Sequence, residues 1–184
     1  MNRDDKHLTE YLVNLGVHAV GHTQKTYLGH LLAVERLLDE AGCPRDVCRA
    51  GLFHSIYGTE LFQGFKLPLE KREELRALIG ERAERLAYLN CAMDRPFFDG
   101  VVQDGASPPR FRDRLTGEEL PLSTEDFDDL CRVHLYDWIE QAPRSRHGWG
   151  YRRAAYRAMA DRLGETAKAA YDRAFATEAE VSQQ

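Results

Sequence analysis

Hydrophobic residues recur along most of the chain at intervals of three and four, the spacing of helices that bury one face. The run over residues 26–41 has a broad apolar face, and Gly42 and Pro44 end it. Gly80 divides a later run into two parts. Together these runs predict helices over residues 6–20, 26–41, 45–56, 70–88, 123–143 and 151–180, the last as one helix or a pair.

The pattern changes after the fourth helix, where proline and glycine become frequent. Residues 94–124 are therefore predicted to be a loop and hairpin insertion. Within it, the stretch RDRLTGEELPL predicts a small β-hairpin at about 110–122. We expect one all-α domain over residues 1–184, a helical bundle that carries this hairpin and ends in a frayed tail at 178–184.

Composition narrows the classes of partner. Hydrophobic residues make up 43% of the 184, enough for a core, and the net charge is −5. This balance lacks the basic footprint of a nucleic-acid-binding protein. The polar N-terminus and the lack of an apolar run of about 18 residues predict no signal peptide and no membrane span. None of the four cysteines forms a CxxC pair. These features predict a cytoplasmic protein that binds neither nucleic acid nor membrane.

Three residues stand out as candidate metal ligands. His30 lies in the second predicted helix, His54 ends the third, and Asp137 lies in the helix over 123–143. Each alone is typical of a packing residue. Together, two histidines and one carboxylate can hold a single divalent ion and leave coordination positions open.

The order of these segments resembles the HD superfamily of metal-dependent phosphohydrolases, most closely its RelA/SpoT-type hydrolase branch. HLLAVERLLDEAGCPRDVCRAGLFHS is similar to that family's first ligand histidine, a helix, a turn and a second helix that ends in His-Asp. RVHLYDWIEQ is similar to the segment that bears the last metal aspartate, and YRAMADRLG to the closing helix. The resemblance covers about residues 18–93 and 127–165, and it implies an HD-like helical fold.

The resemblance also implies a ligand set, from which the chain departs at one position. Three of the family's ligands fall on His30, His54 and Asp137. The aspartate of its His-Asp pair falls on Ser55. A neutral hydroxyl supplies neither the charge nor the strong hard-cation bond of a carboxylate, which argues against a two-metal centre. The Glu-Asp pair of alarmone-hydrolysing members is missing as well, and Glu60 is the nearest carboxylate that could act as a base.

Further candidates are weaker. His134 lies three residues before Asp137 on the same helix face, and it is a candidate replacement ligand or supporting partner. His22 is a second such candidate. The basic and aromatic candidates for substrate binding are Lys25, Tyr57 and Arg144. For each of these the alternative is an ordinary packing or solvated side chain.

Three functions follow from these residues. The first is a hydrolase of a small phosphate-containing, nucleotide-like or related substrate, with one Mn, Fe or Zn ion and with Glu60 or Ser55 steering water. The second is a degenerate HD scaffold that binds a nucleotide or another small molecule without catalysis. The third is a non-haem iron oxygenase. The expected partner is a small-molecule substrate, and a homo-oligomer is left open.

Overall fold

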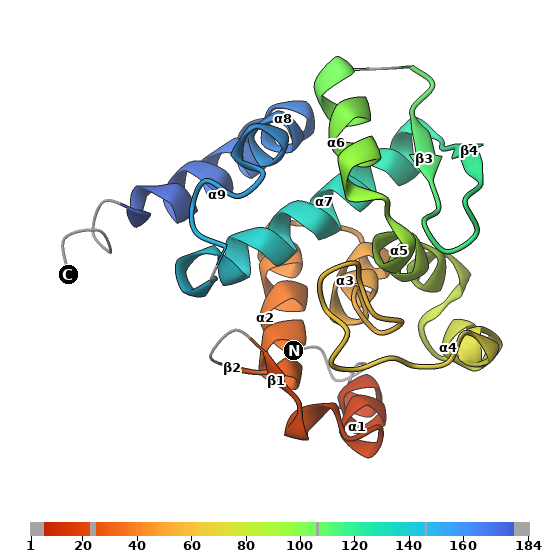
Figure 1. Cartoon of the computed structure of the whole chain (residues 1–184). Coiled ribbons are helices and arrows are strands. Elements are labelled where there is room, and N and C mark those ends of the chain that lie inside the picture. The colour runs from red at the N-terminus through yellow and green to blue at the C-terminus, as the bar shows by residue number, and fades with distance from the viewer. Residues whose placement is uncertain (1–5, 23–24, 106, 146, 179–184) are drawn as a thin grey trace. The chain divides into compact units, whose positions relative to one another are not determined.

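The computed structural model describes residues 6–22, 25–105, 107–145 and 147–178, apart from the side chains of His22 and Lys25. Most of these residues are helical, and a small antiparallel hairpin accompanies the helices (Figure 1). The predicted all-α class with one small hairpin is therefore confirmed. The chain divides into two compact units, residues 1–91 and 92–184, and each is described by itself.

The first unit is built mainly from helices, and its longest connection without helix or strand runs over residues 53–68. Its elements are α1 (Lys6–Asn14), η2 (Val17–Ala19), β1 (Gly21–His22), β2 (Lys25–Thr26), α2 (Tyr27–Glu40), α3 (Arg45–Leu52), η3 (Leu69–Lys71), α4 (Arg72–Ile79) and α5 (Glu81–Ala92). The two-residue strands β1 and β2 pair antiparallel, with Gly21 opposite Thr26. Sequence periodicity did not predict this short pair, because two residues are too few to show an alternation.

Local chemistry sets the ends of these helices. The Thr26 hydroxyl accepts a hydrogen bond from the Gly29 amide at 3.1 Å and so caps α2. Gly80 adopts a φ of 96° between α4 and α5, which confirms the predicted break. Gly16, at a φ of 80°, ends the predicted helix over 6–20 early, so that only α1 and a 3₁₀ turn form.

Gly51 allows α2 and α3 to approach closely (Figure 1). A methyl group at this position would lie only 2.3 Å from Cδ1 of Leu38 on α2. The buried side chains of Leu31, on α2, and of Phe53 and Ile56, just after α3, belong to one hydrophobic core. The absence of a side chain at Gly51 therefore lets α2, which carries His30, pack closely against α3, which leads into the turn with His54.

Gly51→Ala should lower the free energy of unfolding by about 1–3 kcal/mol, because the added methyl overpacks the contact with Leu38. Urea denaturation measures this loss. Gly100→Ala is the matched control, since no described atom lies within 4 Å of the methyl group added there. If both variants were as stable as the parent, the close approach of α2 and α3 would not depend on Gly51.

The described residues of the second unit form four α-helices, one 3₁₀ helix and the hairpin. Its elements are α6 (Arg95–Asp104), β3 (Arg110–Arg112), β4 (Glu119–Pro121), α7 (Thr124–Gln141), η4 (Ala142–Arg144), α8 (Arg153–Leu163) and α9 (Glu165–Ala176). Strands β3 and β4 pair antiparallel with Phe111 opposite Leu120, within the predicted hairpin range. Gly117, at a φ of 78°, lies in the turn between them.

Helix α6 differs from the sequence prediction, which gave residues 94–124 to a loop and hairpin insertion. The Asp94 side chain accepts a hydrogen bond from the Phe97 amide at 3.1 Å and caps the helix. Pro96 lies in the first turn, where no intrahelical amide is needed. Phe98 and Val102, four residues apart, are both buried. Proline therefore lies in the first turn of a helix here, and Gly105, at a φ of 64°, ends it.

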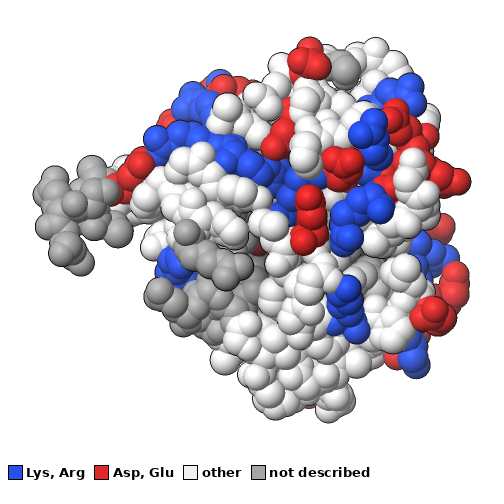
Figure 2. Space-filling model, in the orientation of Figure 1, with Lys and Arg blue, Asp and Glu red and all other residues white. Residues whose placement is uncertain are grey.

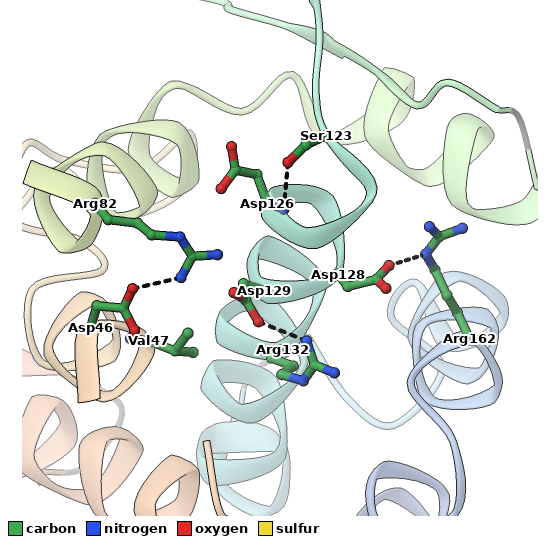
Figure 3. Close-up of polar contacts among 9 residues, drawn as sticks. All are labelled: Asp46, Val47, Arg82, Ser123, Asp126, Asp128, Asp129, Arg132 and Arg162. Atoms are coloured by element: carbon green, nitrogen blue, oxygen red, sulfur yellow. Dashed lines mark hydrogen bonds and ion pairs between the residues drawn. The ribbon is translucent and has the colours of Figure 1, made fainter. Parts of the chain in front are cut away.

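Ion pairs join helices within each unit (Figure 3). In the first unit, Arg82 of α5 lies 2.6 Å from Asp46 of α3. In the second unit, Arg162 of α8 lies 2.6 Å from Asp128 of α7. The Ser123 hydroxyl accepts from the Asp126 amide at 3.0 Å and caps α7, as its sequence predicts. Some of the charged side chains thus lie at contacts between helices rather than on the solvent-exposed surface alone.

Acidic and basic side chains are mixed on the molecular face seen in Figure 2. Short-range pairs such as Arg36–Glu40, at 2.9 Å along α2, fit this mixture. Among the described residues, no helix is both long enough and apolar enough to cross a membrane.

Candidate functional site

Two buried histidines of the first unit face each other. The Nε2 atoms of His30 and His54 are 3.3 Å apart, and their rings meet edge to face at 80°. The side chains are 0% and 2% exposed. His30 lies on α2, and His54 lies in the turn that follows α3. The structure therefore brings together two of the predicted ligands, which are 24 residues apart in the sequence.

The hydrogen bond at the other side of the His54 ring fixes its tautomer. Nδ1 of His54 lies 2.7 Å from the carbonyl oxygen of Gly51. A carbonyl oxygen only accepts, so Nδ1 carries the hydrogen. The neutral ring then has its lone pair on Nε2, the atom that faces His30. This is the arrangement of a metal-binding histidine, whose other nitrogen donates to a backbone carbonyl.

The sequence predicted a helix over residues 45–56 with His54 near its end. In the structure His54 lies beyond the helix. Helix α3 ends at Leu52, and the following residues form turns up to Gly58, which has a φ of 79°. The His54 carbonyl instead accepts hydrogen bonds from Asn90 Nδ2 at 2.8 Å and Cys91 Sγ at 3.2 Å, both on α5. Hydrogen bonds from α5 thus take the place of the one that would continue α3 past His54.

The spacing of the two imidazoles fits a common metal ion. Two nitrogens that each lie 2.0–2.1 Å from one ion in tetrahedral geometry are about 3.3–3.4 Å apart. The observed separation of His30 Nε2 and His54 Nε2 is 3.3 Å. The pair can therefore supply two ligands without moving its rings apart.

Ser55 and Glu60, the predicted water-steering residues, have different surroundings. The Ser55 hydroxyl is buried and lies 2.9 Å from the Tyr27 hydroxyl. The Tyr27 ring in turn packs against Phe62 and Phe65, at centroid distances of 4.7 and 6.0 Å. Glu60 is exposed in the loop that carries these aromatic residues. Of the two, only Glu60 is open to solvent, and the roles of both stay predictions.

Tyr57, a predicted substrate-binding residue, lies in a buried polar network. Its hydroxyl donates to Glu84 Oε1 at 2.9 Å. Arg72 donates to the same carboxylate with Nε at 2.7 Å and Nη2 at 3.1 Å, and its guanidinium lies 3.6 Å from the centre of the Tyr88 ring. Burial, and then the charge of Glu84, raises the pKa of Tyr57. Sequence reasoning missed this network, because its members are 12 and 27 residues apart.

Comparison with known families places a match over this same part of the chain. The model of a domain of unknown function, DUF6817, matches residues 11–95. Comparisons with curated proteins and with solved structures find no match. The matched range contains both His30 and His54 and ends close to the boundary of the first unit. The match assigns no activity, and the resemblance to the HD superfamily stays a prediction.

Asp137, the third predicted ligand, belongs to the second unit and is described there. It lies on α7 and is 6% exposed. Its Oδ1 accepts a hydrogen bond from Gln141 Nε2 at 2.8 Å, one helical turn onward. Its carboxylate is thus oriented within its own helix.

His134 is engaged by an arginine of the same unit. Its Nε2 lies 2.7 Å from Nη1 of Arg152 and therefore accepts from the guanidinium. Arg152 also donates from Nε to Asp99 at 2.7 Å. Burial acts to lower the pKa of Arg152, but the hydrogen bond to Asp99 and the charge interactions with Tyr156, Asp99 and Tyr151 together outweigh it, and the pKa is raised. The Nε2 lone pair of His134 is thus occupied, and the sequence held no signal for this partner.

Of the remaining predicted residues, one is engaged within its own unit and two have side chains outside the described part of the chain. Arg144 is paired with Glu140 at 2.7 Å, one turn back. The side chains of His22 and Lys25 lie outside the described residues, although their backbones pair in β1 and β2. Their predicted roles stay predictions.

Proposed function

We propose that this chain is a metal-dependent hydrolase that binds one divalent ion and acts on a small phosphate-containing substrate. The observation that carries the proposal is the buried pair of His30 and His54, with Nε2 atoms 3.3 Å apart. The Gly51 carbonyl holds the His54 ring in the tautomer that leaves Nε2 available. The same distance is that of two nitrogen ligands on one tetrahedral ion.

The rest of the ligand set follows from the sequence pattern. Asp137 is the carboxylate at the position that the HD resemblance gives to the last metal aspartate, and we propose it as the third ligand. Ser55 stands at the position of the aspartate in the resembled family's His-Asp pair, so we propose one ion rather than two. When bound, the ion would supply Lewis-acid activation of water and of a phosphoryl oxygen. Manganese, iron and zinc all suit this donor set.

The chain's own residues would handle the proton and the substrate. Glu60 is the exposed carboxylate nearest in sequence to His54, and we propose it as the group that accepts a proton from the attacking water. Lys25 and Arg144 are the proposed phosphate partners. The Tyr57 hydroxyl donates to Glu84, so it is not available as a donor to the substrate.

Metal analysis of the purified protein tests the proposal directly. We expect about one divalent ion per chain, and phosphate release from a panel of nucleotides and sugar phosphates that stops on chelation and returns with added ion. Protein that turns over substrate equally well without metal would contradict the proposal.

A second candidate function is binding without catalysis. It is favoured by Ser55, whose hydroxyl is paired with Tyr27 where the resembled family has a carboxylate. Thermal shift measurements with nucleotides, in the presence and absence of a chelator, separate the two. Stabilisation by a nucleotide in chelator, without turnover in metal, supports the binding function.

A further inference from the structure

We propose that Asn90 is a positioning residue that fixes the imidazole of His54 opposite that of His30. Its importance for metal binding rests on the proposed function. The hydrogen bonds around the His54 ring and backbone are made by the chain's own groups. All the contacts involved lie within the first unit.

The His54 carbonyl has lost its helical partner. In a continuing helix, the Gly58 amide would donate to it, but Gly58 N donates to the Ser55 carbonyl at 2.9 Å instead. The His54 amide is itself 3.5 Å from the Gly51 carbonyl, at the limit of a hydrogen bond. The backbone at His54 therefore depends on side chains from elsewhere for its position.

Asn90 supplies the stronger of the two side-chain contacts. Its amide donates to the His54 carbonyl at 2.8 Å, and the residue is 1% exposed. Cys91 offers a thiol at 3.2 Å, which is a weaker donor than an amide. A buried carbonyl that loses its partner is costly, so the turn would shift to find another.

A shift of the turn would reach the ring. On one side of the imidazole, Nδ1 lies 2.7 Å from the Gly51 carbonyl oxygen. On the other side, Nε2 lies 3.3 Å from Nε2 of His30. With the His54 backbone held by Asn90, both distances are satisfied at once. Movement of the backbone by a fraction of an ångström would lengthen at least one of them.

The test measures Co²⁺ affinity by titration of the metal-free protein. We expect Asn90→Ala to weaken binding by about 10- to 100-fold, the usual effect of removing a group that supports a ligand. Cys91→Ala should have a smaller effect. Leu75→Ala is the control, because it removes a buried side chain of α4 and lowers the Tm without deleting a donor to His54.

A second measurement reports the tautomer of the His54 imidazole directly. Two-bond proton–nitrogen spectra of metal-free, ¹⁵N-histidine-labelled protein should show His54 as the Nδ1–H tautomer. Asn90→Ala should give a mixture of tautomers, whereas Leu75→Ala should keep the parent signal. Asn90→Ser keeps a donor near this position and should give intermediate results. It replaces Asn90→Ala in both measurements if the latter does not fold.

The outcomes separate the two proposals. If the parent binds Co²⁺ and the Asn90 variant binds it as tightly with an unchanged tautomer, the positioning role is wrong and the metal function stands. If the parent binds no Co²⁺, the proposed metal function fails and the spectra alone decide: a changed His54 tautomer supports the role of Asn90, and an unchanged one overturns it.

Discussion

His54→Ala is expected to lower the affinity for Co²⁺ or Zn²⁺ by more than about 100-fold, because removing a ligand should cost more than removing a group that merely supports one. The variant deletes one of two nitrogens that lie 3.3 Å apart in a buried setting. Isothermal titration of the metal-free protein measures the change. Phosphate release, if the proposed hydrolysis occurs, should fall with it.

His18→Ala is the matched control, because His18 is exposed on the 3₁₀ helix of the same unit. It should bind metal as the parent does. A His54→Ala protein that kept its metal would show that the ion is held elsewhere. A matching loss in the His18 variant would indicate weak binding to surface histidines in general.

Glu84→Leu is expected to lower the free energy of unfolding by about 3 kcal/mol. Glu84 is fully buried and receives hydrogen bonds from Tyr57 and Arg72. Removing one member of a buried pair leaves the others without their charge partner, which costs more than the pair itself contributes. The Arg72 side chain is 28% exposed, so solvent recovers part of that cost. Urea denaturation gives the value.

Glu73→Leu provides the comparison for this change. Glu73 pairs with Arg76 at 2.7 Å, but its side chain is 80% exposed. Such a pair contributes little to stability. Equal stability of the Glu73 and Glu84 variants would contradict the view that the buried network holds α4 and α5 to the turn at Tyr57.

The helices could be predicted from the sequence where an apolar face continues along the chain and a cap or glycine residue marks where a helix begins or ends. Ser123 and the break at Gly80 are examples. Helix α6 was missed, because Pro96 and Gly100 suggested a loop although proline suits a first helical turn. The early end of α3 was missed too, because it depends on hydrogen bonds from Asn90 and Cys91.

The candidate site was predictable only in part. His30 and His54 were singled out by their order and helical setting, and they do lie together. The partners that define them chemically could not be predicted. The Gly51 carbonyl is only three residues before His54, but its contact depends on how the ring is turned. The guanidinium of Arg152 reaches His134 from 18 residues away, which residue spacing does not encode. The binding of one Mn, Fe or Zn ion and the class of substrate stay predictions.

The turn from His54 to Tyr57 is attached to one helix at both ends, by Asn90 at the His54 carbonyl and by Glu84 at the Tyr57 hydroxyl. Such a segment cannot open alone, since both attachments must break together. Its amide protons should therefore exchange with solvent at the slow rate of α5 rather than at the fast rate of a surface loop. For the proposed site this means slow release of the ion, with a lifetime governed by the opening of the helix and turn as one cooperative unit.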